Sequence, residues 1–177
     1  MKHMLTVSGL IGSIVIASSA HAQVSDLAQR VGSSTLKIGV YSPDKPSVRD
    51  VAGKNILNFS YETIIQNVIE RNETSTFSIG YIEQDALRII PITVSQITRD
   101  NKKTSGYDFF TGYGVGLYAM RLDTLSTTGN TKVMPGFHFI AGLNLTTRSF
   151  IEARYHLTSH YETINPSGLN IAYGIRF

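Results

Sequence analysis

The segment GLNIAYGIRF (168–177) carries the clearest structural pattern in this sequence. Its residues alternate between apolar side chains and small or polar ones. Successive side chains of a β-strand point to opposite faces, so the segment predicts a strand with one apolar face. That face continues to the last residue of the sequence, and something apolar must cover it there too. The apolar positions are Leu169, Ile171, Tyr173, Ile175 and Phe177, and between them lie Asn170, Ala172, Gly174 and Arg176.

The first 22 residues have the pattern of a secretory signal. Lys2 precedes an apolar stretch (residues 4–17), and the letters AHA, which end at Ala22, are the small-x-small pattern of a cleavage site. The apolar stretch is shorter than the ~20 residues that a spanning helix needs. The sequence therefore predicts export, with a cleaved signal peptide at residues 1–22, a periplasmic N-terminal arm at residues 23–34 and a barrel at residues 35–177.

Composition limits what the exported chain can be. Cleavage would leave 155 of the 177 residues, which suits one domain, and would lower the net charge from +3 to +2 by removing Lys2. That charge is too weak to argue for nucleic acid as a partner. The chain has no cysteine, so disulfides and cysteine-ligated metals are excluded. No apolar run of spanning length follows residue 22, so the chain can enter a membrane only as strands.

Alternation recurs along the rest of the chain and predicts eight strands in all. Eight strands in 155 residues allow roughly 19 residues for each strand and connection, as in a small membrane barrel. Connections on one side are mostly longer, as expected of extracellular loops. The seven further strands are expected at 35–41, 56–70, 75–83, 86–98, 109–121, 136–145 and 149–157, although Pro91 is unusual inside a strand. The longer loops are 42–54, 122–133 and 158–167, with a short connection at 84–85, and the opposite turns are 71–74, 99–108 and 146–148.

The non-apolar face of these strands indicates where each face points. Gly112, Gly114 and Gly116 fit the inner wall of a narrow barrel, where eight strands leave little room. Glu152 and Arg154 share one strand face and can neutralise each other inside, whereas an arginine facing lipid at mid-depth would cost about 2–4 kcal/mol. The sequence thus predicts an all-β, eight-stranded antiparallel up-and-down transmembrane β-barrel. The polar residues expected to face its lumen are Glu152, Arg154, His156, Asn170 and Arg176.

The closing segment resembles the C-terminal signal of bacterial outer-membrane proteins. The wider sequence resembles the small eight-stranded outer-membrane barrels of the OmpW/OmpX/OmpA-like type, through FFTGYGVGLYAMR (109–121), FIEARYHL (150–157) and the last strand. The resemblance implies a bacterial outer-membrane location and contact with outer-membrane lipid and lipopolysaccharide. It also implies that the barrel-assembly machinery reads Tyr173, Ile175 and Phe177. The chain departs from the pattern in having no tryptophan, so tyrosine and phenylalanine would form any interfacial girdle.

The expected function is a non-enzymatic one, as a structural or adhesive protein or as a narrow pore for small compounds. Side chains nearly fill an eight-stranded lumen, so bulk porin activity is not expected. His138, His156 and His160 share no turn with matching carboxylates, and we expect no metal, no cofactor and no nucleic acid, and a monomer. A soluble periplasmic ligand-binding barrel is an alternative. The loops 42–54 and 122–133 would carry whatever specificity the protein has.

A second alternative is an outer-membrane esterase. The segment ARYHLTSHYETINPSGLN (153–170) resembles the C-terminal region of the lipid A deacylase family, in which a serine attacks an ester with histidine as the base. The motif is degenerate here, because Thr158 stands where the serine is expected, Ser159 lies on the strand face opposite His156, and Asn170 replaces the acid. The residues that match are Arg154, Tyr155, Asn165, Pro166 and Gly168.

Overall fold

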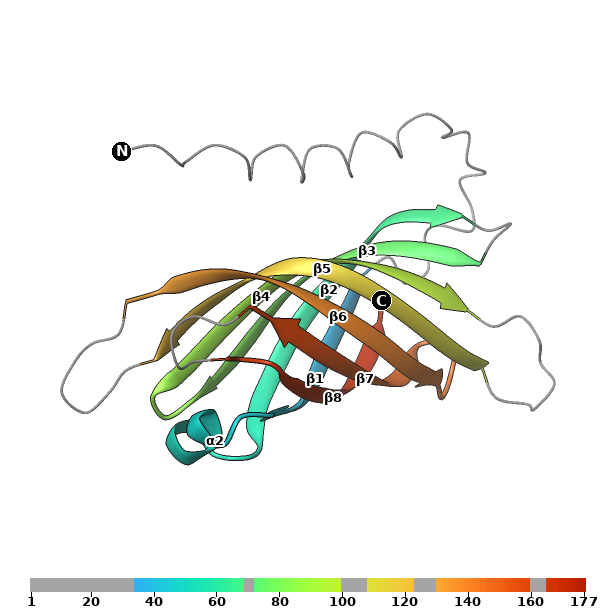
Figure 1. The fold of residues 1–177 in the computed structure, drawn as a ribbon. Coiled ribbons are helices and arrows are strands. Elements are labelled where there is room, and N and C mark those ends of the chain that lie inside the picture. Colours follow the sequence, from blue (N-terminus) through green and yellow to red (C-terminus); the bar gives the residue numbers. More distant parts are fainter. Residues whose placement is uncertain (1–33, 69–71, 100–107, 123–129, 160–164) are drawn as a thin grey trace, which may run out of the picture. The chain divides into compact units, whose positions relative to one another are not determined.

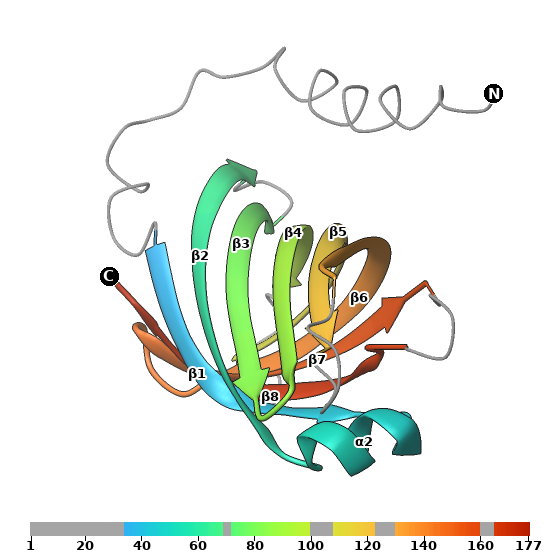
Figure 2. The ribbon, with the colours of Figure 1, turned by 90° about the vertical axis from the view of Figure 1, so that its left-hand side faces the viewer.

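The computed structural model describes residues 34–68, 72–99, 108–122, 130–159 and 165–177. They form a closed barrel in which each strand is antiparallel to its neighbours, and β1 closes the sheet by pairing with β8 (Figures 1 and 2). The predicted fold class, an eight-stranded up-and-down barrel, is confirmed. The strands are β1 (Ser34–Pro43), β2 (Ile56–Val68), β3 (Glu73–Gln84), β4 (Leu87–Arg99), β5 (Asp108–Leu122), β6 (Lys132–Asn144), β7 (Ser149–Thr158) and β8 (Gly168–Arg176).

The strand boundaries follow the sequence pattern within a few residues. The largest difference is at β6, which starts at Lys132 although alternation predicts a start at residue 136. β1 starts at Ser34, one residue inside the segment assigned to the N-terminal arm. The signal peptide and the rest of the arm lie outside the described residues and stay predictions.

A short helix corrects the expectation that residues 42–54 form an irregular loop. This helix, α2 (Pro46–Ala52), starts with proline, which suits the first turn because its missing N–H has no partner there in any case. It ends at Gly53, whose φ of 83° favours glycine and whose N–H bonds to the Arg49 carbonyl at 2.8 Å. Figures 1 and 2 show α2 at the end of the barrel where β1 passes into β2. Among the described residues, no helix has the length and hydropathy needed to cross a bilayer.

The apolar strand faces lie on the outside of the barrel. On β8, Ile171 and Ile175 are 52% and 49% exposed, whereas Asn170 and Ala172 are 4% and 2% exposed. The same alternation of exposed and buried positions runs along β3, β4 and β7. A water-soluble barrel has the opposite arrangement, so this outer surface is suited to an apolar environment.

The barrel interior is layered. We call the end where β1 begins and β8 ends the terminal mouth, and the end that carries α2 the helix mouth. The polar faces of the strands predict a polar interior, and the structure adds to it apolar layers that lie towards both ends. At the helix mouth the cluster contains Tyr41, Val48, Ala52, Ile56, Ile82, Leu87, Ile89, Tyr118, Met120 and Met134. Towards the terminal mouth a smaller cluster contains Ile97, Phe110, Ile140 and Phe150. Buried polar residues between them include Lys37, Glu62, Ser78, Thr93, Ser95, His138, Glu152, Arg154, His156 and Asn170.

Pro91 is accommodated in β4 by a local gap in one ladder. The register of β3 with β4 is continuous from Glu73 to Ile79 and resumes at Ile82, while the ladder of β4 with β5 continues through Pro91. The ring lies against Gly80, where an added Cβ would be 2.9 Å from the proline Cγ. A glycine on β3 therefore provides the space that the proline ring needs.

Candidate functional site

Four buried charged residues form a closed ring of ion pairs in the middle of the lumen. Lys37 Nζ lies 2.9 Å from Glu62 Oε2 and 2.8 Å from Glu152 Oε2. Arg154 completes the ring, with its Nη2 3.0 Å from Glu62 Oε2 and its Nε 3.0 Å from Glu152 Oε1. Each of these side chains is at most 7% exposed. We call this set the ion-pair ring, and its two cations balance its two anions.

Small residues on β8 allow the ring to form between β1 and β7, the two strands on either side of β8. Lys37 on β1 is paired in register with Gly174, and Glu152 on β7 is paired with Ala172. Because β8 presents only these small side chains inward at this level, the long side chains of β1 and β7 meet over it. Arg154 Nη1 also donates to Ser78 Oγ at 3.2 Å, so the ring is tied to β3 as well. Such pairing offsets the large cost of burying each charge.

Two histidines occupy the lumen beside the ion-pair ring. His138 Nε2 lies 2.9 Å from Ser95 Oγ, and His156 Nδ1 lies 2.8 Å from the Tyr118 hydroxyl. Their ring centroids are 5.8 Å apart. Within the described ranges, no group of three or more potential ligands could hold a metal ion. His160 lies outside those ranges.

The structure places the residues singled out from the sequence as follows. Glu152 and Arg154 are in the ring, and His156 is buried next to them. Asn170 is buried on β8, and its Oδ1 has no hydrogen-bond partner among the described residues. Arg176 is partly buried at the terminal mouth. The residues of the expected assembly signal, Tyr173, Ile175 and Phe177, are exposed on the outer face, and their reading by assembly machinery stays a prediction.

Sequence reasoning did not single out Lys37 or Glu62, which supply half of the ion-pair ring. Both carried a readable signal, because each is a charged residue on the non-apolar face of an alternating strand. What the pattern could not show is which charged residues meet. That depends on how the closed sheet aligns β1, β2 and β7.

The described residues of the esterase-like motif do not form a serine–histidine pair. His156 points into the lumen and contacts Tyr118, while Ser159 is exposed. Thr158 Oγ1 is buried and donates to Asn165 Oδ1 at 3.2 Å. Asn165 Oδ1 also accepts the Ser167 N–H at 2.9 Å, so this part of the motif shapes the entry into β8.

Comparison with solved structures agrees with the barrel geometry. The N-terminal β-barrel domain of Pseudomonas aeruginosa OprF matches with a TM-score of 0.54 and 11% identity, covering 84% of this chain and 100% of that one. The Yersinia pestis outer membrane protein Ail, in a phospholipid bilayer nanodisc, matches with a TM-score of 0.53 and 14% identity, covering 82% and 99%. Neisserial surface protein A (NspA) matches with a TM-score of 0.51 and 11% identity, covering 81% and 94%. This chain has the fold of the small outer-membrane β-barrels.

These structural matches establish the fold. Their sequence identities are too low to indicate the activity of the chain. No protein-family model matches the sequence, and a search of curated proteins found no match. The apolar outer face is the arrangement that this fold uses to span a membrane. It also argues against the alternative of a soluble periplasmic barrel, whose exterior would be polar.

Proposed function

We propose that the protein is a bacterial outer-membrane scaffold that presents its loops at the cell surface and neither conducts ions nor catalyses a reaction. The observation that carries this proposal is the filled lumen. The ion-pair ring joins β1, β2 and β7 across the lumen, and an apolar layer lies on each side of it. Of the roles that the sequence left open, this geometry favours a structural or adhesive one over a narrow pore.

Several features of the lumen support a non-conducting state. The cavity at the terminal mouth, beside the smaller apolar layer, has a volume of about 20 Å³, enough for about one water molecule. At the opposite mouth, Val48 and Ala52 of α2 are 2% and 0% exposed within the apolar cluster, so the helix covers that end. A conducting path would need the ring, the apolar cluster at the helix mouth and α2 to rearrange together.

The helix mouth is the end that we propose to be extracellular. Its connections are mostly longer, and α2 gives one of them a fixed shape on which a surface partner could dock. On the outer face near this mouth, Arg88 forms an exposed ion pair with Glu83 at 2.5 Å and lies 5.9 Å from the Tyr81 ring centroid. A tyrosine beside a cation suits the boundary between lipid and water, where lipopolysaccharide carries its phosphates.

Bilayer recordings with the refolded barrel test the proposal. We expect no sustained conductance from the wild-type protein, measured beside a general porin as the positive control. A variant in which residues 45–52 are replaced by a Gly-Ser linker should also remain silent, because the ring and the second apolar layer are still in place. Sustained, reproducible channels from the folded wild-type barrel would contradict the scaffold proposal and show that the protein is a pore.

A further inference from the structure

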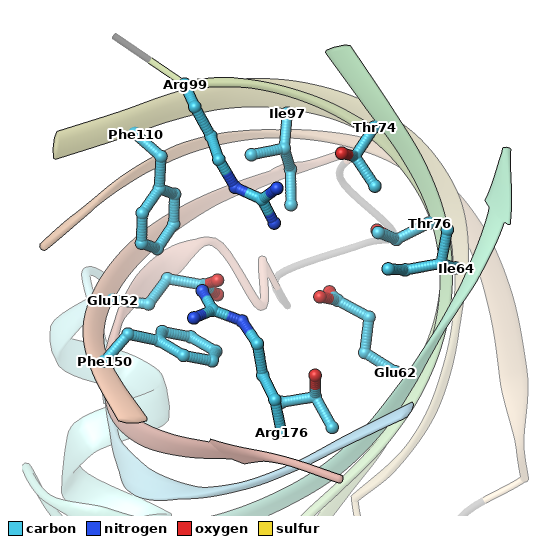
Figure 3. Close-up of a pocket in the computed structure, with 11 residues that line it drawn as sticks. Glu62, Ile64, Thr74, Thr76, Ile97, Arg99, Phe110, Phe150, Glu152 and Arg176 are labelled. Atoms are coloured by element: carbon cyan, nitrogen blue, oxygen red, sulfur yellow. The ribbon is translucent and has the colours of Figure 1, made fainter. Parts of the chain in front are cut away.

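The terminal mouth contains a small pocket with two arginines that the proposed scaffold role does not explain. Figure 3 shows that Arg99, at the end of β4, and Arg176, at the end of β8, both extend into this pocket. Phe110 and Phe150 form one wall, and threonines line the other. Like charges are brought together here at the open end of an otherwise neutral lumen.

The two guanidinium groups have few partners within the protein. Arg176 Nη2 donates to Asn144 Oδ1 at 2.6 Å, and its Cζ lies 4.3 Å from the Phe150 ring centroid. The guanidinium of Arg99 makes no hydrogen bond or ion pair with any residue in the described ranges, and its charge repels that of Arg176. Within this part of the chain, no residue therefore competes with a ligand for the Arg99 guanidinium.

The carboxylates that line the pocket attract Arg176, but they already have cationic partners of their own. Glu62 and Glu152 lie at its inner end, and both are already paired with Lys37 and Arg154 in the ion-pair ring. Because the ring is neutral by itself, the two arginines leave an excess of positive charge. Asp108 attracts Arg176 from the rim, where it also accepts a hydrogen bond from Asn144 Nδ2 at 2.8 Å, and it offsets only part of this excess.

A buried hydroxyl in the same pocket also has no partner. Thr76 is 2% exposed, and its Oγ1 makes no hydrogen bond within the described part of the chain. Figure 3 shows its side chain directed into the pocket from β3, across from the two arginines. A buried hydroxyl without a protein partner costs free energy, so a ligand oxygen that accepts its hydrogen bond is stabilised here.

We propose that the terminal mouth binds an oxyanion, a phosphate or carboxylate group, between Arg99, Arg176 and Thr76. Guanidinium groups bind such oxygens through paired, charge-assisted hydrogen bonds. The cavity of about 20 Å³ holds one oxygen atom, and the remainder of the ligand lies in the open mouth. This site concerns the end of the barrel away from α2, and it does not depend on the scaffold role.

Calorimetric titration of inorganic phosphate tests the site. The barrel is refolded in maltoside micelles, which carry no phosphate, and the ionic strength is held constant because arginine–anion contacts are screened by salt. We expect saturable binding, and at least a roughly tenfold loss of affinity in Arg99→Gln. The matched control is Arg148→Gln, which removes an exposed arginine from the turn before β7, outside the pocket lining, and should leave the affinity unchanged.

Further arms of the titration separate the possible sources of the anion. Phosphate affinity that is unchanged when phosphatidylglycerol is added to the micelles indicates a water-borne ligand, and suppressed affinity indicates a lipid headgroup. Titration with acetate shows whether carboxylates share the site. Thr76→Val keeps the side-chain volume and should weaken binding by several-fold, which tests the site even if Arg99→Gln does not fold. Absence of phosphate binding to the folded wild type, or equal binding by Arg99→Gln and Arg148→Gln, would overturn the proposal.

Discussion

Lys37 and Glu152 are 115 residues apart in sequence, and their Nζ and Oε2 atoms are 2.8 Å apart inside the barrel. They belong to β1 and β7, which are not neighbours, because β8 pairs with both strands and lies between them. The ion pair therefore exists only when the first and last strands have closed the sheet. The pair therefore stabilises the closed barrel and cannot form within any single hairpin.

Removal of Lys37 should destabilise the folded barrel strongly. In Lys37→Met, Glu62 and Glu152 remain buried and share Arg154 as their only cation in the ring. Breaking a buried ion pair in this way costs about 3–5 kcal/mol. Urea unfolding of the barrel in lipid vesicles, followed by its mobility on cold gels, measures the change.

A double variant and a surface variant serve as controls for Lys37→Met. Lys37→Met with Glu152→Gln leaves the neutral pair of Glu62 and Arg154, so part of the lost stability should return. Arg88→Met breaks an ion pair that is exposed on the outer face and should have little effect. Equal losses in Lys37→Met and Arg88→Met would show that the buried ring does not stabilise the barrel.

An arginine introduced on the outer face of β7 should destabilise the folded barrel. Ala153 lies between the exposed residues Ile151 and Tyr155, and in register with Ala141 and Ile171. Ala153→Arg should lower the free energy of unfolding by about 2–4 kcal/mol if the residue lies at mid-depth in lipid.

A substitution nearer the membrane interface provides the control for Ala153→Arg. Leu145 follows the end of β6 and is 48% exposed, so Leu145→Arg is expected to cost only about 0–1 kcal/mol near the interface. A neutral Ala153→Arg variant, with the barrel still folded, would mean that this face does not contact lipid.

Gly174 should not tolerate a larger residue, because its neighbour is an aromatic ring. It is paired with Phe150, whose ring occupies the space that a Cβ would need. Gly174→Ala should destabilise the barrel by about 1–3 kcal/mol through overpacking. Adding Phe150→Leu should restore part of this stability, and strictly additive losses in the double variant would contradict direct packing between the two positions.

The strands and their faces could be predicted because alternation is a local property. The residues of a single strand indicate which of its side chains share a face, as Glu152 and Arg154 do on β7. The partners Lys37 and Glu62 could not be identified in this way, because the ring depends on closure between distant strands. The expected assembly signal and the signal peptide depend on other proteins, and the fold does not test them.

The interior layers and α2 were missed for different physical reasons. Phe110 and Phe150 lie on the inner face, where they pack against Gly142 and Gly174, and a rule that assigns apolar residues to the outside overlooks them. Helix α2 has only seven residues, too few to show a helical period. Its stability comes from Val48 and Ala52 packing into the helix mouth, a tertiary contact that the local sequence does not encode.

Fluorescence of single-tryptophan variants in brominated lipid tests whether the apolar face contacts lipid and whether the lumen is filled. The chain has no tryptophan, so each variant carries one reporter. Tyr173 points outward and is 41% exposed, whereas Phe150 is 2% exposed in the lumen at a similar depth, since their strands are paired there. The structure predicts strong quenching by brominated lipid in Tyr173→Trp and weak quenching in Phe150→Trp, with both variants folded. Equal quenching of the two, or stronger quenching of Phe150→Trp, would show that the apolar face does not lie in lipid with a filled lumen behind it.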